Sequence, residues 1–241
     1  MKTITSKASL SPVISQLSHY SGNGNVNDFW KTLNTDILQH KVKFPILEHV
    51  AMEINRMLDR EQENHLLDQI AKTKHMSGYP VIGKLIQLRL DEGLKTQYDL
   101  AIEHIVQGNE WYVCDIISER VLGEGTLEDF DTSLNLMKDM GNHGNLWIER
   151  SIGIATHYAT KKKLPKEQVE QLLLLMIEHA WKTQYFTKKG IGWAGKTIGK
   201  YHPDLIHKHV DLMRSTKLSR WFISKVNIGL SMAKAEPFLY E

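Results

Sequence analysis

The sequence predicts an all-α protein, an α-solenoid built from stacked antiparallel helix pairs (an α–α superhelix). Three observations lead to this fold class. Apolar residues recur at three- and four-residue steps through most of the chain, which places them on one face of a helix. The periodic segments are similar in length and separated by short Gly, Asn, Pro or Ser-Thr stretches, which favour antiparallel neighbours. No segment has the alternating pattern of a strand.

The helical segments follow one another along the chain. In residues 44–72, Ile46, Val50, Ile54 and Met57 form one apolar stripe, so we expect an amphipathic helix there. Comparable patterns cover residues 77–93, 96–108, 111–123, 126–141, 145–160, 165–181, 186–202 and 202–215. We therefore expect a single HEAT-like helical-repeat domain over residues 1–241, with repeats of about 35 to 45 residues. Residues 1–25, which end in SGNGN, are expected to form an irregular cap.

Helix boundaries support the same segmentation. Thr126 precedes Glu128 in the manner of an N-terminal cap, and Pro165 stands one position before the first turn of its helix. Glycines follow the periodic segments at the positions where helices commonly end. These are Gly93, Gly108, Gly123 and Gly141.

Composition excludes several classes of protein. With 41% hydrophobic and 24% charged residues, the chain is globular rather than disordered. The single cysteine, Cys114, permits no internal disulfide and is expected to be a small core residue. The beginning of the chain lacks a signal-peptide pattern, and the longest apolar run, residues 172–177, is too short to span a membrane. These features predict a soluble cytoplasmic protein that does not bind membranes.

Two sequence motifs suggest a bound ligand, but neither has the sequence context that such a site needs. The segment GIGWAGKT, residues 190–197, matches both a dinucleotide fingerprint and a P-loop, but the preceding AWKTQYFTKK is too polar to be the buried strand that both require. His207 and His209 are two residues apart on a helix and face different directions, with no carboxylate or cysteine cluster nearby. We therefore predict neither a nucleotide cofactor nor a metal.

Charge is concentrated in one part of the chain. The net charge is only +2, yet ten Lys and Arg residues and only two acidic residues lie between Lys182 and Lys225. A basic face of this kind suits a polyanion such as nucleic acid. A solvated helix surface is the alternative interpretation of the same charges.

Aromatic and ionic residues distinguish three segments. In NEWYVCD, Trp111 and Asp115 are four residues apart and therefore project from the same side of a helix. The segment NLWIERSIGIA contains Arg150, and the helix that begins near residue 186 contains Trp193. The remaining tryptophans are expected in the core or in packing interfaces: Trp30, Trp147, Trp181 and Trp221.

These segments resemble, in order, the motifs of the AlkD-type DNA alkylation-repair glycosylases, which are built of HEAT-like repeats. The family's W-x-x-x-D element is similar to Trp111–Asp115, its W-x-x-R element to Trp147–Arg150, and its F-x-x-K-x-I-G-W-A helix to residues 186–194. The segment LSRWFISKVNIGL resembles the closing helix, so the likeness extends from about Gly108 to Leu230. It implies that Trp111, Asp115, Arg150 and Trp193 form the active site.

The resemblance implies hydrolysis of the N-glycosidic bond of N3- or N7-alkylated purines in double-stranded DNA, on a shallow concave surface. Such bases are cationic, so two indole faces can hold them by cation–π contacts, and a carboxylate at Asp115 can stabilise positive charge that develops on the sugar. Arg150 is expected to hold a flanking phosphate. The expected DNA contacts are Arg150, Lys188, Lys189, Lys196, Lys200 and Arg220. The protein would act as a monomer, associated with the nucleoid when bound to DNA.

The chain departs from the family after the G-W-A motif, where Gly195, Lys196 and Thr197 replace the more usual Leu-Arg-Glu. Lysine lacks the bidentate fork of arginine, which affects the nearby phosphate contacts. Gly192, Gly195 and Gly199 lie on one side of a helix and would allow close approach of another helix or of a DNA backbone.

Other hypotheses fit the same residues. Asp115 and Arg150 can form a structural ion pair, or Asp115 can cap a helix. At the level of the whole protein, the alternatives are a non-catalytic DNA-binding relative and a HEAT-like scaffold for protein interactions.

Overall fold

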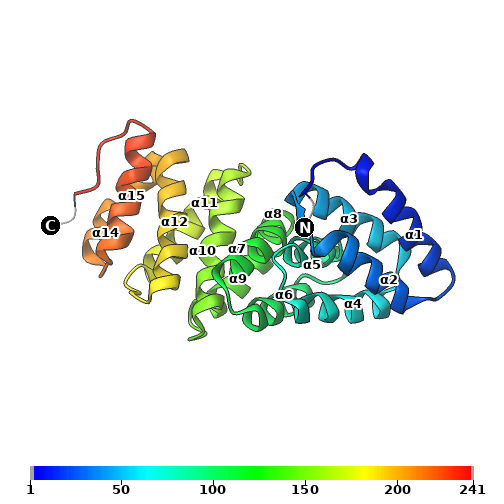
Figure 1. The fold of residues 1–241 in the computed structure, drawn as a ribbon. Helices are drawn as coiled ribbons and strands as arrows, with labels where there is room; N and C mark the ends of the chain where they lie inside the picture. Colours follow the sequence, from blue (N-terminus) through cyan, green and yellow to red (C-terminus); the bar gives the residue numbers. More distant parts are fainter. Residues whose placement is uncertain (1–2, 240–241) are drawn as a thin grey trace. The chain divides into compact units, whose positions relative to one another are not determined.

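The computed structural model describes residues 3–239, and they are almost entirely helical, which confirms the all-α prediction (Figure 1). One extended feature was not expected: β1 (Thr3–Ile4) pairs in parallel with β2 (Lys41–Val42). Within residues 3–239, no helix has both the length and the apolar character that a membrane crossing needs.

The chain divides into two compact units, Met1–Gly93 and Leu94–Glu241, which are described here one at a time. The expectation of one continuous repeat domain over residues 1–241 therefore stays a prediction.

The first unit contains five α-helices among the described residues: α1 (Ser11–Gly22), α2 (Val26–Leu33), α3 (Phe44–Met57), α4 (Arg60–Thr73) and α5 (Gly78–Gln87). A π-helical segment (Asn34–Leu38) extends α2, and short 3-10 turns cover Ala8–Leu10 and Leu90–Glu92. Helix α1 lies within residues 1–25, where a cap was expected, and the role of this segment as a cap stays a prediction.

The long helix expected over residues 44–72 is two helices. Asp59 stands between α3 and α4 and accepts a hydrogen bond from the backbone N–H of Gln62 at 2.9 Å. The Gln62 side chain accepts one from the backbone N–H of Asp59 at 3.1 Å, which completes a capping box. The apolar stripe runs through both helices, so periodicity alone did not detect the break.

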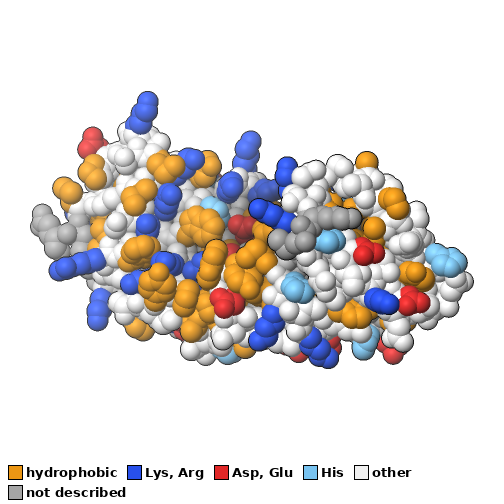
Figure 2. Space-filling model, in the orientation of Figure 1, with side chains coloured by type: hydrophobic (Ala, Val, Ile, Leu, Met, Phe, Trp, Pro, Cys, Tyr) orange, Lys and Arg blue, Asp and Glu red, His pale blue; other side chains and the backbone are white. Residues whose placement is uncertain are grey.

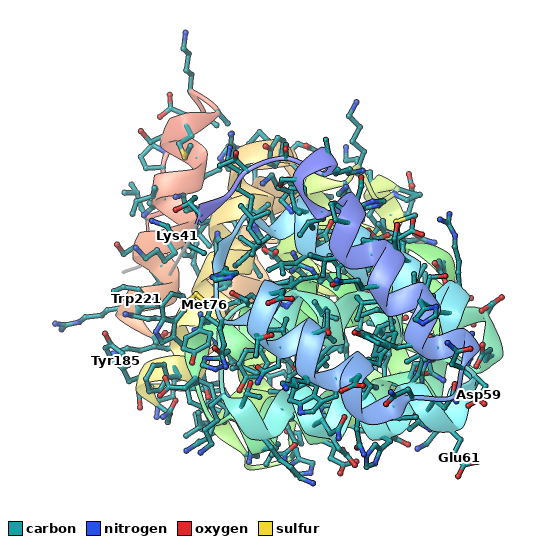
Figure 3. All side chains as sticks on the ribbon, turned by 45° about the vertical axis from the view of Figure 1, so that its right-hand side comes forward. Lys41, Asp59, Glu61, Met76, Tyr185 and Trp221 are labelled. Carbon is teal, nitrogen blue, oxygen red and sulfur yellow. The ribbon has the colours of Figure 1, made fainter. Side chains whose placement is uncertain are left out.

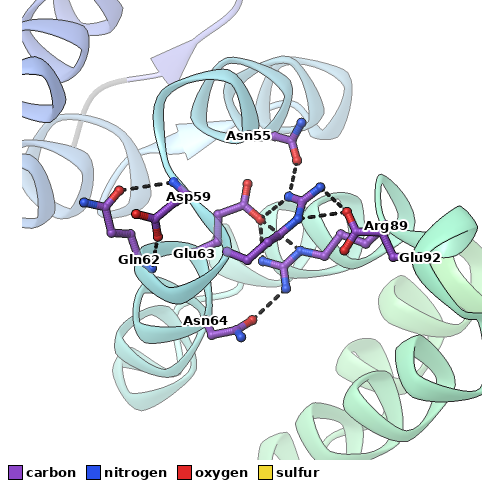
Figure 4. A network of polar contacts seen from close by, with 8 residues as sticks. Asn55, Asp59, Gln62, Glu63, Asn64, Arg89 and Glu92 are labelled. Carbon is purple, nitrogen blue, oxygen red and sulfur yellow. Dashed lines mark hydrogen bonds and ion pairs between the residues drawn. The ribbon is translucent and has the colours of Figure 1, made fainter.

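A network of charged and amide side chains joins α4 to Asn55 of α3 and to the 3-10 turn after α5 in this unit (Figure 4). Glu63 is completely buried, and its Oε2 accepts hydrogen bonds from Arg60 at 2.8 Å and from Nε of Arg89 at 2.9 Å. Arg89 also donates to Oδ1 of Asn64 at 2.6 Å. The network ties the helices together inside the unit.

The second unit begins with α6 (Leu94–Gly108), α7 (Trp111–Ser118), a π-helical segment (Glu119–Gly123) and α8 (Glu124–Glu128). It continues with α9 (Phe130–Gly141), α10 (Leu146–Lys161), α11 (Lys166–His179) and α12 (Tyr185–Tyr201). The unit ends with α13 (Pro203–Lys208), α14 (Val210–Ser215) and α15 (Arg220–Met232). The segment expected as one helix over residues 202–215 is therefore the two short helices α13 and α14.

Helix pairs stack in this unit as the solenoid prediction requires. Helices α7, α10, α12 and α15 begin at Trp111, Leu146, Tyr185 and Arg220, which are 35, 39 and 35 residues apart. Helix α10 packs against α7 and α12, and α12 packs against α15, so these four helices form one layer (Figure 1). Their partners α6, α9 and α11 pack against them from the other layer.

Glycines allow the close contacts within this layer. A Cβ on Gly153 of α10 would lie 2.3 Å from the backbone of Gly190 in α12, so neither position has room for a side chain. A Cβ on Gly195 or Gly199 would meet Phe222 or the backbone of Val226 in α15. The glycine side of α12 therefore packs against helix α15. Another helix was one of the two neighbours expected there, and a DNA backbone was the other.

Candidate active site

Helix α7 presents two of the predicted residues. The chain turns sharply between α6 and α7, where Asn109 has a left-handed φ of 50°, and α7 then begins at Trp111. The indole of Trp111 is 51% exposed in this first turn. Asp115 follows one turn later with 14% of its side chain exposed, since its neighbours Val113, Cys114 and Ile116 point into the core.

Arg150 of α10 holds the Asp115 carboxylate with a two-pronged contact. Its Nε donates to Oδ1 at 2.8 Å and its Nη2 donates to Oδ2 at 2.9 Å. The remaining guanidinium nitrogen, Nη1, donates to the backbone carbonyl of Phe186 in α12 at 3.0 Å. This buried guanidinium links three helices and fixes the plane of the carboxylate, while each carboxylate oxygen keeps a free lone pair.

Trp193 of α12 forms the opposite wall of the site. Its ring stacks on the imidazole of His157 from α10, with centroids 4.2 Å apart and an angle of 27° between the planes. Burial lowers the pKa of His157 to about 4, and the positive charges of Lys161 and Lys196 act in the same direction. The imidazole is therefore neutral at pH 7.

The four predicted catalytic residues line one cleft of about 540 Å³. Its full lining is Trp111, Asp115, Arg150, Tyr185, Phe186, Lys189 and Trp193. A smaller hollow of about 230 Å³ adjoins it along Arg150, Lys189 and Trp193 and is completed by Lys196 and Lys225. An open cleft lined by two tryptophan side chains and a carboxylate suits a flat cationic ligand.

Lysines surround the cleft, and several are held over aromatic rings. Lys189 donates to the hydroxyl of Tyr185 at 2.6 Å, and Lys188 lies 5.8 Å from the centre of the Tyr185 ring and 5.7 Å from that of Trp221. Lys225 lies 4.3 Å from the Trp221 ring. Tyr185 and Trp221 project on the same side of α12 and α15 (Figure 3), and basic and apolar side chains interleave over these helices (Figure 2).

Not every base of the positive segment is available to a ligand. Lys182 pairs with Glu149 at 2.7 Å, and Lys208 pairs with Glu170 at 2.7 Å. Of the predicted DNA contacts, Lys189 and Lys196 line the cleft or the hollow, and Arg220 is exposed at the start of α15. Lys200 lies 4.8 Å from the centre of the Tyr201 ring, toward the other end of α12.

Comparison with known proteins gives an independent assignment. A family model described as DNA alkylation repair enzyme matches residues 24–225, which is most of the chain. The chain belongs to the DNA alkylation repair enzyme family. The match includes every residue of the cleft, and it supports a role in DNA alkylation repair with DNA as the partner. No curated protein and no solved structure matches the chain.

Several residues around the cleft of this DNA alkylation repair enzyme family member were not predicted from the sequence. Tyr185, Phe186 and Lys225 line the cleft or the hollow, and His157 supports Trp193. A helical wheel could have found two of them, because Tyr185 is four residues before Lys189 and His157 is seven residues after Arg150. Nothing in the sequence distinguishes Lys225 from the other bases of its segment.

Other predictions about single residues can be compared with the structure. Cys114 is buried, and its pKa is raised to about 12, chiefly by burial, as expected of a core residue. Trp147 is buried as expected, but Trp181 is 51% exposed and is not a core residue. His209 pairs with Glu170, and within residues 3–239 no cluster of His, Cys, Asp and Glu is arranged to hold a metal ion.

Proposed function

We propose that this member of the DNA alkylation repair enzyme family is a DNA glycosylase. Its reaction would be hydrolysis of the N-glycosidic bond of N3- or N7-alkylated purines in duplex DNA. The observation that carries the proposal is the meeting of Trp111, Trp193 and an oriented Asp115 carboxylate in one cleft. Such residues match the needs of a substrate that is cationic before the reaction and whose sugar becomes cationic during it.

The aromatic residues would bind the lesion. An alkylated purine carries a positive charge on its ring, and each indole face in contact with it contributes about 0.5 to 2 kcal/mol, depending on how far water is excluded. Trp111 is half exposed and Trp193 is partly exposed, so both rings are accessible from the cleft. An unmodified purine has no such charge and would gain less from these contacts.

The carboxylate would act on the sugar. As the bond between C1′ and the base nitrogen breaks, its electron pair moves to the base and neutralises it, and positive charge develops on the deoxyribose. Asp115 would stabilise this charge and orient a water molecule whose oxygen forms the new bond to C1′. The water proton passes to the carboxylate or to solvent.

Arg150 would position the carboxylate. Asp115 and the Phe186 carbonyl use three of the five guanidinium N–H groups of Arg150, so the phosphate contact expected for Arg150 could involve only the remaining two and stays a prediction. Lys189, Lys196 and Lys225 line the adjoining hollow and are better suited to hold a flanking phosphate.

The test is release of a modified base from defined DNA. Duplexes that contain a single N7-methylguanine or N3-methyladenine are incubated with excess protein, and the free base is measured by mass spectrometry. We expect release from both duplexes above the spontaneous rate and none from an undamaged duplex. Protein that binds these duplexes and releases no base would contradict the proposal.

A specific observation favours a second candidate, a DNA-binding relative without catalytic activity. The Asp115–Arg150 contact has the geometry of a structural ion pair and joins α7 to α10. In that case Asp115 would stabilise the fold, and binding of duplex DNA would fall with salt but lead to no base release.

A further inference from the structure

We infer that His157 is a positioning residue that holds the indole of Trp193 as a wall of the cleft and, as a neutral ring, keeps that indole receptive to a cation. The inference rests on the proposed function for its effect on base release. Its structural part concerns only the contact between the two rings.

The stacking contact has a defined geometry. The His157 and Trp193 rings lie 4.2 Å apart at 27°, close to the offset-parallel arrangement that aromatic pairs favour. His157 is buried and Trp193 is partly exposed and lines the cleft. The imidazole therefore supports the indole from inside the protein and leaves other parts of it open to a ligand.

Hydrogen bonds lock the imidazole in this position. Thr197 lies one turn after Trp193, and its hydroxyl donates to the Trp193 carbonyl at 3.0 Å. Nδ1 of His157 is 2.6 Å from the same hydroxyl oxygen. Since the hydroxyl proton is already used, Nδ1–H is the donor, which selects the tautomer with a proton on Nδ1. The chain from His157 through Thr197 to the Trp193 backbone fixes both rings.

The surroundings of His157 disfavour its charged form. The charged groups that bear on the ring are Lys161, one turn along α10, and Lys196 of α12, and both are cations. Burial acts in the same direction, so the pKa is lowered to about 4. Within the described residues no carboxylate contributes to this shift.

A neutral imidazole matters because the indole must bind a cation. The electrostatic attraction of a cation to an aromatic face depends on the negative potential of that face. An imidazolium stacked against Trp193 would occupy that potential and repel a second positive charge nearby. Protonation of His157 would therefore weaken binding of a cationic base without any movement of Asp115.

Two pairs of variants separate positioning from simple loss of structure. His157→Phe keeps a stacked ring that cannot protonate, whereas His157→Ala removes the ring. Thr197→Ser keeps the hydroxyl that orients the imidazole, whereas Thr197→Val removes it in nearly the same volume. His207→Ala is the matched control, because His207 is exposed, contacts the Glu236 carbonyl and does not line the cleft.

The first measurement needs no activity. Tryptophan emission is recorded from pH 7 to pH 3, and the signal of a Trp193→Phe variant is subtracted to isolate Trp193. We expect a transition near pH 4 in the wild type and in His207→Ala, and its absence in His157→Phe. A transition that persists in His157→Phe would overturn the inference, whether or not the protein releases bases.

The second measurement is single-turnover base release. We expect His157→Ala and Thr197→Val to lower the maximal rate about tenfold at pH 7 with DNA affinity changed less than about threefold, because a misplaced wall disturbs the bound geometry. Thr197→Ser should release the base at the wild-type rate. In the wild type we expect the rate to decline as the pH is lowered toward 4, and in His157→Phe this part of the decline should be absent. Wild-type rates in both His157→Ala and Thr197→Val would overturn the inference, whereas an inactive wild type would overturn the proposed function instead.

Discussion

Two buried arginine–carboxylate contacts, one in each unit, differ in both their hydrogen bonds and their surroundings. In the first unit, Arg89 and Arg60 both donate to a single oxygen of Glu63, and the other oxygen, Oε1, is buried without a hydrogen-bond partner in the structure. In the second unit, Arg150 donates separately to each oxygen of Asp115, and the carboxylate borders a cleft with two tryptophans. The Glu63 side chain is 0% exposed and the Asp115 side chain 14% exposed.

An ion pair is therefore not evidence of function by itself. Both arginines are buried and both join separate helical segments. Of the two carboxylates, only that of Asp115 lines a cleft that a ligand can enter, and for this reason we propose a chemical role for this pair alone. The predictions below use Glu63 as the structural counterpart of Asp115.

The largest expected effect is on stability, in the first unit. Glu63→Gln leaves the Arg89 guanidinium buried without a countercharge, so we expect the free energy of unfolding to fall by about 3–5 kcal/mol. Asp115→Asn has the same change of charge and shape, but its site is open to water, so we expect a loss of about 1–2 kcal/mol. Urea-induced unfolding followed by circular dichroism measures both. Equal losses would favour the structural interpretation of Asp115.

Substitution of the two arginines by lysine also distinguishes the Asp115 pair from the Glu63 pair. Arg150→Lys keeps the charge but cannot hold both oxygens of Asp115, so we expect base release to fall by about tenfold to a hundredfold, with DNA affinity changed less than about threefold. Arg89→Lys should reduce stability and leave release per folded molecule unchanged. Single-turnover kinetics and fluorescence anisotropy with labelled duplex measure the two quantities. A large loss of DNA affinity in Arg150→Lys would instead indicate a direct phosphate contact.

The lysines around the cleft should affect binding rather than chemistry. Lys189→Ala, Lys196→Ala and Lys225→Ala are each expected to reduce the slope of log affinity against log salt by about 1, because each removes one phosphate contact. Lys166→Ala is the control, since Lys166 lies on α11 and pairs with Asp204. Anisotropy titrations at several salt concentrations measure the slopes. An unchanged slope for all three variants would remove the hollow from the DNA interface.

The last expected effect is a dependence of stability on pH. The pKa of His157 is lowered from 6.5 to about 4 in the folded protein, so between these values the unfolded chain binds more protons at this position. Its contribution to stability is therefore complete above about pH 6.5 and lost as the pH falls toward 4. Thermal melts measure this effect: we expect the melting temperature of the wild type to fall more steeply than that of His157→Phe as the pH is lowered from 6.5 to 4. The same pH dependence in both proteins would show that another group is responsible.

Much of the second unit could be predicted from the sequence because helical signals are local. The apolar period located α6, α7, α10, α11 and α12, and the four-residue spacing of Trp111 and Asp115 predicted their common helix side. The single helix expected over residues 126–141 was wrong: Thr126 lies inside α8, and Asp129 rather than Thr126 caps α9. The break at Asp59 was missed because a capping box can interrupt a helix without interrupting its apolar stripe.

The parts of the site that were missed depend on contacts between helices. No sequence pattern indicates that Arg150 donates to the Phe186 carbonyl. The stacking of His157 on Trp193 requires α10 and α12 to approach closely, which depends on Gly153 and Gly190 facing each other. Such pairings between distant segments have no local signature.

The most direct test of the central claim is single-turnover release of N7-methylguanine by Asp115→Asn at saturating DNA. We expect a loss of about a hundredfold or more in rate, with duplex affinity retained, because the amide cannot stabilise positive charge on the sugar. Release at the wild-type rate by a folded Asp115→Asn protein would contradict this claim.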